Sequence, residues 1–400
     1  MIKTSTRRTR KKLRRRFCGV KNTLGMDNKH ERNQEMKDKL INILFISQLS
    51  GDRSGGPTYS VPAQVRAQMA FDHVYWLNLS NANLPEWNEG GLVCHCVDAV
   101  PNQKLSDLPA PFDAPDLVVF EEFYRFKPTG LTLEIFKKRI PYVIIPRSSM
   151  TREAQNHKRL KKNIGNAVWF TRFANHAAGI QFLTPEEKQN SMPFGKKNGY
   201  VVPNGIDIPR GQTTVSPDRM QCTYIGRIRT YQKGLERMIE AVAKCASLIR
   251  KVGARFDLYG SDLLGARALL EEKIVESGIE DLMEIHDAIY GEEKKKVLLQ
   301  ADVFVMTSLF EGMSMGMIEA LAYGLPCIAT EGTNMAAAIE EAGAGWNAGN
   351  SVEEIANAIE KMIAEKANLC DYGNRARELA KKYSWNTIAQ QSHEQYRRII

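Results

Sequence analysis

The segment over residues 226–234 (GRIRTYQKG) combines residue types that bind anions. It follows an apolar run typical of a strand and precedes a pattern typical of a helix. The free N–H groups at that helix start, its dipole and the cations Arg227 and Lys233 would then converge on one place. This is the chemistry of a phosphate site, although a solvated basic loop is the simpler interpretation of the segment taken alone.

A second segment, residues 311–326 (EGMSMGMIEALAYGLP), also follows a predicted strand and opens a helix. Its small residues Gly312 and Ser314 let a ligand approach the backbone closely. Glu319 lies about one turn into the helix, where a carboxylate can bind both hydroxyls of a ribose while the N–H groups below it bind phosphate oxygens. A helix-dipole role would explain Glu319 but not Glu311. The two segments together predict a nucleotide site.

Alternating strands and helices must position these loops. An apolar run at residues 41–47 leads through Gly55-Gly56-Pro57 into a helical pattern that ends near residue 69. Further strands are predicted at 74–79, 92–97, 116–120, 142–145 and 179–183, with a long helical pattern between the last two.

A turn signal, Pro203-Asn-Gly, marks a domain junction before a second series of this kind. Its predicted strands are 222–225, 255–259, 282–286, 302–306 and 327–329, and its helices are 235–249, 265–276, 292–300 and 315–323. We therefore expect two consecutive halves, each with a parallel, doubly wound sheet, and the deepest site in the cleft between them.

The composition fits this architecture. The chain has 400 residues, 43% of them hydrophobic and 25% charged, which is typical of a folded protein with about two domains. No apolar run approaches the roughly 18–20 residues of a membrane span. Seven scattered cysteines predict reduced thiols in a cytoplasmic protein.

The positive charge is concentrated at the start of the chain. Residues 1–39 hold 14 Lys or Arg against four acidic residues, whereas the rest holds 41 basic and 42 acidic residues. This pattern predicts a basic disordered leader and argues against a nucleic-acid-binding fold. Three interpretations of the leader stay open: a start set too early, with Met26 and Met36 as later starts, contact with anionic lipid, or contact with nucleic acid. No apolar segment follows the charges, so a signal peptide is not expected.

These motifs, taken in order, resemble glycosyltransferase family 4 over residues 41–396. The resemblance rests on Gly55-Gly56-Pro57, Pro203-Asn-Gly-Ile-Asp207, the Gly-Arg and Lys-Gly pair, and two glutamates eight residues apart. Residues 141–147 and 383–385 resemble members that build bacterial exopolysaccharide and lipopolysaccharide. The resemblance implies a GT-B fold of two Rossmann-like domains, a nucleotide diphosphate-sugar donor held mainly by the second, an acceptor held by the first, and retention at the anomeric carbon.

The resemblance also implies roles for individual residues. Arg227 and Lys233 would neutralise the donor diphosphate, and Glu319 would bind the ribose. The transferred sugar would contact Glu311, as a catalytic residue, and the backbone of Gly312, Met313 and Ser314. Gly55 and Gly56 would approach the diphosphate from the other domain, and the base would lie against residues 282–289. No Asp-x-Asp occurs, so neither a metal nor another cofactor is expected.

The chain departs from the family pattern at Glu121 and Glu122. Relatives often carry a His in the first-domain wall that faces the donor sugar, whereas this chain has two carboxylates after the predicted strand 116–120. We expect Glu121 to replace that His as a catalytic partner of the sugar, with one pKa of the pair raised. The alternative is two solvated acids. His157 and His176 are expected at the surface or in packing, and His286 stays open.

The expected domains are a basic leader (1–39), a Rossmann-like acceptor domain (40–206, rejoined by a helix over 385–400) and a Rossmann-like nucleotide-sugar domain (207–384). The expected protein is a metal-independent, retaining hexosyltransferase of cell-surface polysaccharide biosynthesis. Its partners would be the donor and a glycan or lipid-linked acceptor, without nucleic acid. We expect it in the cytoplasm, either free or in peripheral contact with anionic lipid at the inner membrane face. The basic stretch 157–162 could supply such a contact or be a solvated face.

Two alternatives stay open. A GT-B nucleotide-sugar epimerase would use the same phosphate-binding logic, but it needs acids and bases around the sugar. A non-catalytic assembly partner would keep the fold, although the four charged residues at 227, 233, 311 and 319 argue against it. A dehydrogenase is disfavoured because no Gly-x-Gly-x-x-Gly follows the first strand.

Overall fold

The computed structural model describes residues 40–400, apart from 54, 157–158, 192–197, 212–219 and 263–264. The predicted leader (1–39) and His157 lie outside the described residues. Asn42–Ile400 form one structural unit, which carries everything that follows.

The first sheet has seven parallel strands in the order β3-β2-β1-β4-β5-β6-β7. Aromatic side chains such as Phe120, Phe123 and Phe173 fill its core. The strands are β1 (Asn42–Ser47), β2 (His73–Asn78), β3 (Cys94–His95), β4 (Leu117–Glu121), β5 (Tyr142–Ile145), β6 (Gly179–Phe182) and β7 (Gly199–Val201). The helices are α2 (Pro57–Gln68), α3 (Gly130–Lys138), α4 (Arg152–Asn156), α5 (Arg159–Gly165), α6 (Thr171–His176) and α7 (Pro185–Asn190).

The second sheet has six parallel strands in the order β10-β9-β8-β11-β12-β13. The strands are β8 (Met220–Ile225), β9 (Ala254–Tyr259), β10 (Met283–His286), β11 (Val303–Met306), β12 (Cys327–Ala329) and β13 (Gly345–Asn347). The helices are α8 (Thr230–Lys233), α9 (Leu235–Lys244), α10 (Ala246–Val252), α11 (Ala266–Glu276), α12 (Gly291–Gln300), α13 (Met315–Ala322), α14 (Ala336–Glu341), α15 (Val352–Ala364), α16 (Leu369–Lys381) and α17 (Trp385–Ile399).

The strand order reverses next to the first strand of each sheet. β1 pairs with β2 on one side and β4 on the other, and β8 pairs likewise with β9 and β11. Ligands bind at the carboxyl ends of strands at such switch points. The loops after β1, β8 and β11 carry the predicted site segments, so the fold brings them to those edges. The predicted pair of doubly wound sheets is confirmed.

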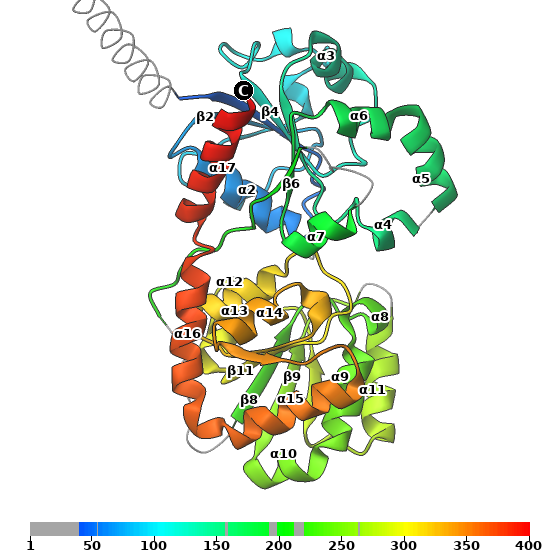
Figure 1. Ribbon diagram of the computed structural model, residues 1–400, viewed down its shortest axis with the longest axis vertical. Helices are drawn as coiled ribbons and strands as arrows, with labels where there is room; N and C mark the ends of the chain where they lie inside the picture. The colour runs from blue at the N-terminus through cyan, green and yellow to red at the C-terminus, as the bar shows by residue number, and fades with distance from the viewer. Residues whose placement is uncertain (1–39, 54, 157–158, 192–197, 212–219, 263–264) are drawn as a thin grey trace, which may run out of the picture. The chain divides into compact units, whose positions relative to one another are not determined.

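The last helix, α17, packs against α2 near the start of the chain (Figure 1). Ser384 caps α17 by accepting a hydrogen bond from the N–H of Thr387, and Trp385 and Ile388 pack against Val202. Gly205 is required here, because a Cβ atom at that position would lie 2.2 Å from the Trp385 ring. The predicted domain boundaries remain a prediction.

Several element predictions differ from the structure. The strand expected at 92–97 shortens to Cys94–His95, where Val93 is exposed and the apolar alternation fails. The helix expected at 235–249 divides into α9 and α10 at Cys245. The long helical pattern after β5 divides into α4, α5, a π-helical turn (Asn166–Phe170) and α6. The prediction also missed two strands, β7 and β13, and six helices, α3, α7, α8, α14, α15 and α16.

Both missed strands are only three residues long, too short for a periodic pattern. β13 also begins with a glycine, which usually indicates a turn. Gly345 is needed there because a Cβ atom would lie 2.0 Å from the carbonyl oxygen of Cys327, on the neighbouring strand.

Within the described part of the chain, no helix has the length and apolar character needed to cross a membrane. The described cysteines are all free thiols: Cys94, Cys96, Cys222, Cys245, Cys327 and Cys370.

Candidate active site

A cavity of about 540 Å³ lies where loops at the carboxyl ends of the strands meet. It contains most of the residues that the sequence predicted. The predicted residues that line it are Gly55, Gly56, Arg227, Lys233, Glu311, Met313, Ser314 and Glu319. Gly312 and Glu121 are not part of its lining.

Lys233 and Glu311 form a buried ion pair in this cavity. Their side chains are 7% and 11% exposed, and the Lys233 ammonium donates to Glu311 Oε1. The Ser308 hydroxyl donates to the same oxygen over 2.9 Å. Removing one partner of such a pair would leave a desolvated charge. The two residues, predicted to bind different parts of the donor, therefore act as one unit.

Backbone geometry explains why Lys233 reaches this place. It ends the short helix α8, and Gly234 follows in the left-handed conformation with φ of 61°. The Thr307 hydroxyl donates to the carbonyl oxygens of Lys233 and Gly234, over 3.2 and 3.0 Å. A Cβ atom at position 234 would lie 2.1 Å from the Thr307 carbonyl oxygen. The Lys-Gly pair thus fixes the lysine against the end of β11.

The start of α13 presents backbone N–H groups to the cavity. Ser314, Met315 and Gly316 line it, and no side chain of the described residues caps this helix start. Asn334 Nδ2 donates to the carbonyl oxygens of Glu311 and Gly312, over 2.6 and 3.1 Å, which fixes the preceding loop. Uncapped N–H groups and the helix dipole favour a bound anion.

Glu319 and Lys294 form a second ion pair, between α13 and α12. Both side chains are 24% exposed, and both residues line the cavity. The sequence analysis missed Lys294. Its only signal was the run Lys294–Lys296 after the helix start at Gly291, and such a run is usually a solvated face.

Arg227 offers its charge to the cavity without an acidic partner. No ion pair of Arg227 is found among the described residues. Its backbone is fixed, because the Tyr224 hydroxyl donates to the Arg227 carbonyl oxygen over 2.9 Å. Gly260 allows this loop to approach β9, since a Cβ atom there would lie 1.8 Å from the carbonyl oxygen of Gly226. Arg227 is thus positioned to bind an anionic ligand.

Several residues of the cavity wall were not predicted as site residues. Tyr59 on α2 is one, and burial raises the pKa of its phenol. Arg53, which pairs with Glu86 over 2.8 Å, is another. The others that bear on binding are Asp207, Tyr290, Lys294 and Trp385. Ala288 and Ile289, which belong to the predicted base-binding segment 282–289, also line the wall.

Glu121 lies elsewhere, in the interior of the first sheet. Its side chain is fully buried at the end of β4, and Oε2 accepts a hydrogen bond from Arg147 Nε over 2.9 Å. Burial raises the pKa of Glu121, although Arg147 opposes this shift. Glu122 has a φ of 83° and pairs with Arg125 over 2.7 Å. The structure therefore brings neither carboxylate to the cavity wall, and we no longer propose Glu121 as a contact of the sugar.

Arg147 is the residue that sequence reasoning missed here. Its guanidinium, 6% exposed, also donates to Ser60 Oγ, Gln64 Oε1 and Asn204 Oδ1, over 2.9, 2.9 and 3.2 Å. It thereby joins β4, helix α2 and the segment between the two sheets. Gly312 lies beside Ser148, the residue after Arg147, because a Cβ atom at position 312 would lie 2.1 Å from Ser148 Oγ.

None of the histidines that the structure describes lines the cavity. His176 is exposed on α6. His286 stacks on Tyr259, and its Nε2 lies 3.2 Å from Asp257 Oδ1. Asp257, Glu284 and His286 lie close enough to share a metal ion, but Arg255 pairs with Glu284 over 2.5 Å and supplies positive charge there. These three residues do not line the cavity, so they do not indicate a metal ion bound beside the ligand there.

Comparison with known proteins gives the class. Residues 219–365 match the family described as "Glycosyl transferases group 1". Sucrose-phosphate synthase from Thermosynechococcus elongatus superposes with a TM-score of 0.67 at 18% identity, over 89% of this chain and 98% of that one. Anabaena HepE, in a complex with UDP and glucose, gives 0.66 at 18%, over 88% and 98%. The architecture is therefore the GT-B fold.

Curated relatives match at the sequence level. The glycosyltransferase MJ1607 of Methanocaldococcus jannaschii is 26% identical over 228 residues, 54% of this chain and 55% of the relative. The GDP-mannose:cellobiosyl-diphosphopolyprenol alpha-mannosyltransferase of Xanthomonas oryzae is 25% identical over 208 residues, 49% and 52% of the two chains. The match spans about half the length of these relatives. Residues 219–365 thus resemble the glycosyltransferase group 1 family, also called family 4, which the motifs of the chain predicted.

Proposed function

We propose that the protein is a retaining glycosyltransferase that moves a sugar from a nucleotide diphosphate-sugar to a glycan or lipid-linked acceptor. One observation carries this proposal. A single cavity holds the uncapped start of α13, the cation Arg227, the Lys233–Glu311 pair and Glu319. These groups can bind the ribose, the diphosphate and the sugar of one donor molecule next to one another.

The diphosphate is the leaving group, so its charge grows in the transition state. Arg227, Lys233 and the N–H groups of Ser314 to Gly316 stabilise that charge from fixed positions. The Lys233 ammonium then contacts both the Glu311 carboxylate and a phosphate oxygen. The glycines at 55 and 56, before α2, leave room for the diphosphate on the opposite wall.

The two glutamates bind opposite ends of the donor. Glu319 accepts hydrogen bonds from the ribose hydroxyls, and the ion pair with Lys294 holds its carboxylate in place. Glu311 accepts from hydroxyls of the transferred sugar, while Lys233 and Ser308 hold one of its oxygens. Both glutamates are therefore positioned by partners before the donor binds.

The bond from the anomeric carbon to the phosphate oxygen breaks while the acceptor oxygen bonds to that carbon on the same face. The departing phosphate takes the acceptor proton, so no strong side-chain base is needed. The cations of the cavity supply the charge that a metal would otherwise provide. We therefore propose a metal-independent reaction, in which turnover persists with chelator.

Relatives support a choice of donor and acceptor to test first. HepE of Anabaena was solved with UDP-glucose, and the Xanthomonas oryzae relative is named for GDP-mannose and a diphosphopolyprenol acceptor. WaaG is described as involved in lipopolysaccharide biosynthesis, and EpsF is a putative glycosyltransferase of Bacillus subtilis. We propose a hexosyl transfer in cell-surface polysaccharide synthesis, in the cytoplasm or at the inner membrane face.

The cavity favours transfer over epimerisation. An epimerase needs acids and bases free to act on the sugar, whereas Glu311 is tied to Lys233 and Glu319 to Lys294. Nothing in the cavity favours a non-catalytic assembly partner over an enzyme.

A donor panel tests the proposal. The full chain is incubated with UDP- and GDP-sugars and with simple glycan and lipid-linked acceptors, and nucleotide release is measured with and without chelator. We expect one donor to be consumed in an acceptor-dependent way, with a product that keeps the anomeric configuration. Binding without turnover of any donor would favour the assembly partner, and an inverted product would contradict the proposed mechanism.

A further inference from the structure

An apolar stripe lies exposed on the helical segment after β5. Leu160 and Ile164 on α5 and Val168 in the π-helical turn are 77%, 60% and 74% exposed. Residues four apart lie on the same face of a helix, so the three side chains form one row. The opposite face holds Trp169 and Phe173, which are buried in the core of the first sheet. The segment is therefore apolar on both faces, and one of these faces meets solvent.

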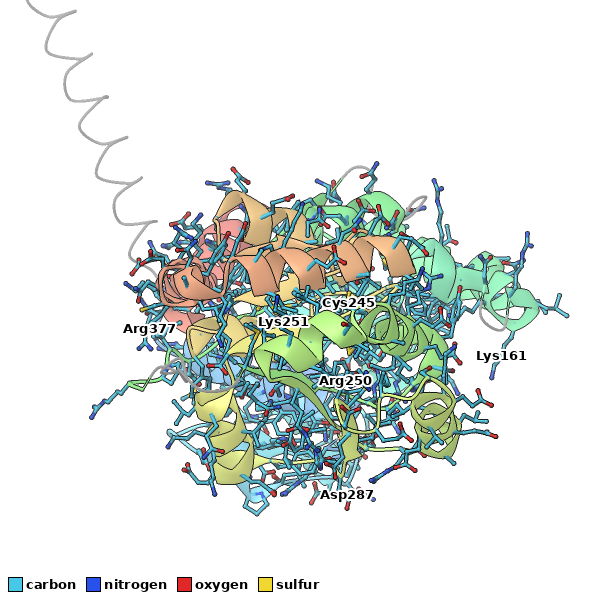
Figure 2. The ribbon with its side chains drawn as sticks, turned by 90° about the horizontal axis from the view of Figure 1, so that it is seen from below. Lys161, Cys245, Arg250, Lys251, Asp287 and Arg377 are labelled. Atoms are coloured by element: carbon cyan, nitrogen blue, oxygen red, sulfur yellow. The ribbon has the colours of Figure 1, made fainter. Side chains whose placement is uncertain are left out.

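Basic residues flank this stripe. Residues 159–172, which contain the stripe, have four Lys or Arg and no acidic residue. Arg159 and Lys161 are exposed on α5, Arg172 is exposed on the following helix α6, and Lys161 extends outward in Figure 2. Residues 40–400 together carry about one net negative charge, so this positive region is local.

An exposed row of aliphatic side chains edged with cations matches the surface of an anionic bilayer. The apolar groups enter the boundary between headgroups and acyl chains, and the cations meet lipid phosphates. A protein interface of ordinary size would need a larger patch with aromatic anchors at its centre. The charge complementarity therefore favours a lipid surface as the occupant.

The stripe also lies next to a second cavity. The Lys162 ammonium lies 5.0 Å from the centre of the Tyr124 ring, and Tyr124 lines a cavity of about 420 Å³. Arg125 and Lys127 line that cavity too. A lipid-linked acceptor held at the bilayer would meet this basic cavity beside the docked helix.

We propose that the face formed by Leu160, Ile164 and Val168, with its flanking cations, docks on an anionic lipid bilayer. The docking itself does not require the proposed sugar transfer. Vesicle binding and donor turnover are measured separately, so either proposal can fail alone.

Flotation with vesicles tests the docking. The full chain is mixed with vesicles of phosphatidylcholine and phosphatidylglycerol, or of phosphatidylcholine alone. We expect binding to the mixed vesicles, and about a tenfold or greater loss in the triple variant Leu160→Ser, Ile164→Ser, Val168→Ser. The matched control changes Leu269 and Val275 to Ser. These residues of α11 have similar exposures of 62% and 60%, and the control should bind like the unchanged chain.

Three outcomes would overturn the docking proposal. One is unchanged binding of the triple variant, which would move the contact to another part of the chain. Another is equal binding to vesicles without phosphatidylglycerol. The third is a dimer that the triple variant abolishes, because the stripe would then be a protein interface.

A second measurement does not depend on a triple substitution. In Ile164→Trp, brominated acyl chains should quench the added emission, whereas Leu269→Trp on α11 should show no added quenching. Equal quenching in the two variants would contradict insertion of the stripe.

Discussion

Lys233 and Glu311 lie 78 residues apart in the sequence, yet each is the main partner of the other. Their types and positions were predictable, because each lies in a glycine-containing segment that follows a strand. Their pairing was not predictable, because it depends on the pairing of β8 with β11. The same limit applies to Lys294, whose role depends on the contact of α12 with Glu319.

Arg227 and Lys233 should respond differently to removal of their charge. Arg227→Met should weaken nucleotide diphosphate binding by ten- to a hundred-fold, about 1.5–3 kcal/mol for a charge-assisted hydrogen bond. Its melting temperature should stay unchanged, because no buried acid loses a partner. Lys233→Met should weaken binding and also destabilise the fold, because Glu311 would stay buried and unpaired. Calorimetry and thermal melting separate these effects.

The double variant Lys233→Met, Glu311→Gln is the control for this difference. It should recover part of the lost stability, but not donor turnover. Equal melting temperatures for Arg227→Met and Lys233→Met would show that the ion pair does not stabilise the folded protein.

Glu319→Ala should weaken donor binding at least tenfold, because the ribose hydroxyls lose their acceptor. Its fold should stay intact, since the side chain is a quarter exposed on the cavity wall. The matched variant Glu341→Ala, at the end of α14 and outside the cavity wall, should bind the donor normally. Normal donor affinity in Glu319→Ala would contradict the proposal that Glu319 binds the ribose of the donor.

At the scale of elements, the guanidinium of Arg147 joins the end of β4, helix α2 and the segment before Gly205. The sequence shows only an arginine after a strand. It does not show the φ values of 48° and 68° at Arg147 and Ser148 that turn the chain there. Glu121 was predicted to face the sugar because it stands where relatives often carry a His, and the sequence did not show that Arg147 holds it inside the fold.

Arg147→Met should lower the free energy of unfolding by about 3–5 kcal/mol, because Glu121 would remain buried without its partner. Adding Glu121→Gln should restore part of this loss. Chemical unfolding of the two variants measures both changes. Glu121→Gln alone should leave nucleotide diphosphate affinity normal, and a large loss of affinity there would place Glu121 back in the site.

Glu365 gives a prediction about pH. Hydrogen bonds from the Tyr372 hydroxyl (2.6 Å) and then the Trp346 indole (2.8 Å) lower the pKa of its carboxyl. A carboxyl with a lowered pKa in the folded state stabilises the protein above its unfolded pKa, near 4.5. That stability is lost as the pH falls through the lower folded value.

Glu365→Gln should therefore reduce the melting temperature at pH 7, with an effect of at most about 1 kcal/mol because the residue is only partly buried. The difference between the two proteins should shrink below pH 4.5. Melting curves across that range check this, and a difference that grew toward acid pH would contradict the assigned shift.

At the scale of the whole chain, alternating apolar runs sufficed to predict two doubly wound sheets. Buried parallel strands read as short continuous apolar runs, and that signal is strong for central strands such as β1 and β5. The signal fails at sheet edges, where β3, β7 and β13 are short and partly exposed. The lining of the 540 Å³ cavity was largely predictable because it lies at central strands, whereas the stripe on α5 became visible only when its burial was known.

The central claim is that the cavity binds a nucleotide diphosphate through protein groups alone. The most direct measurement is calorimetric titration of the full chain with UDP and GDP in the presence of chelator. We predict that at least one of them binds, that Arg227→Met and Glu319→Ala each weaken this binding at least tenfold, and that Leu269→Ser leaves it unchanged. Failure of both nucleotides to bind under these conditions, or equal affinity in all four proteins, would contradict the account.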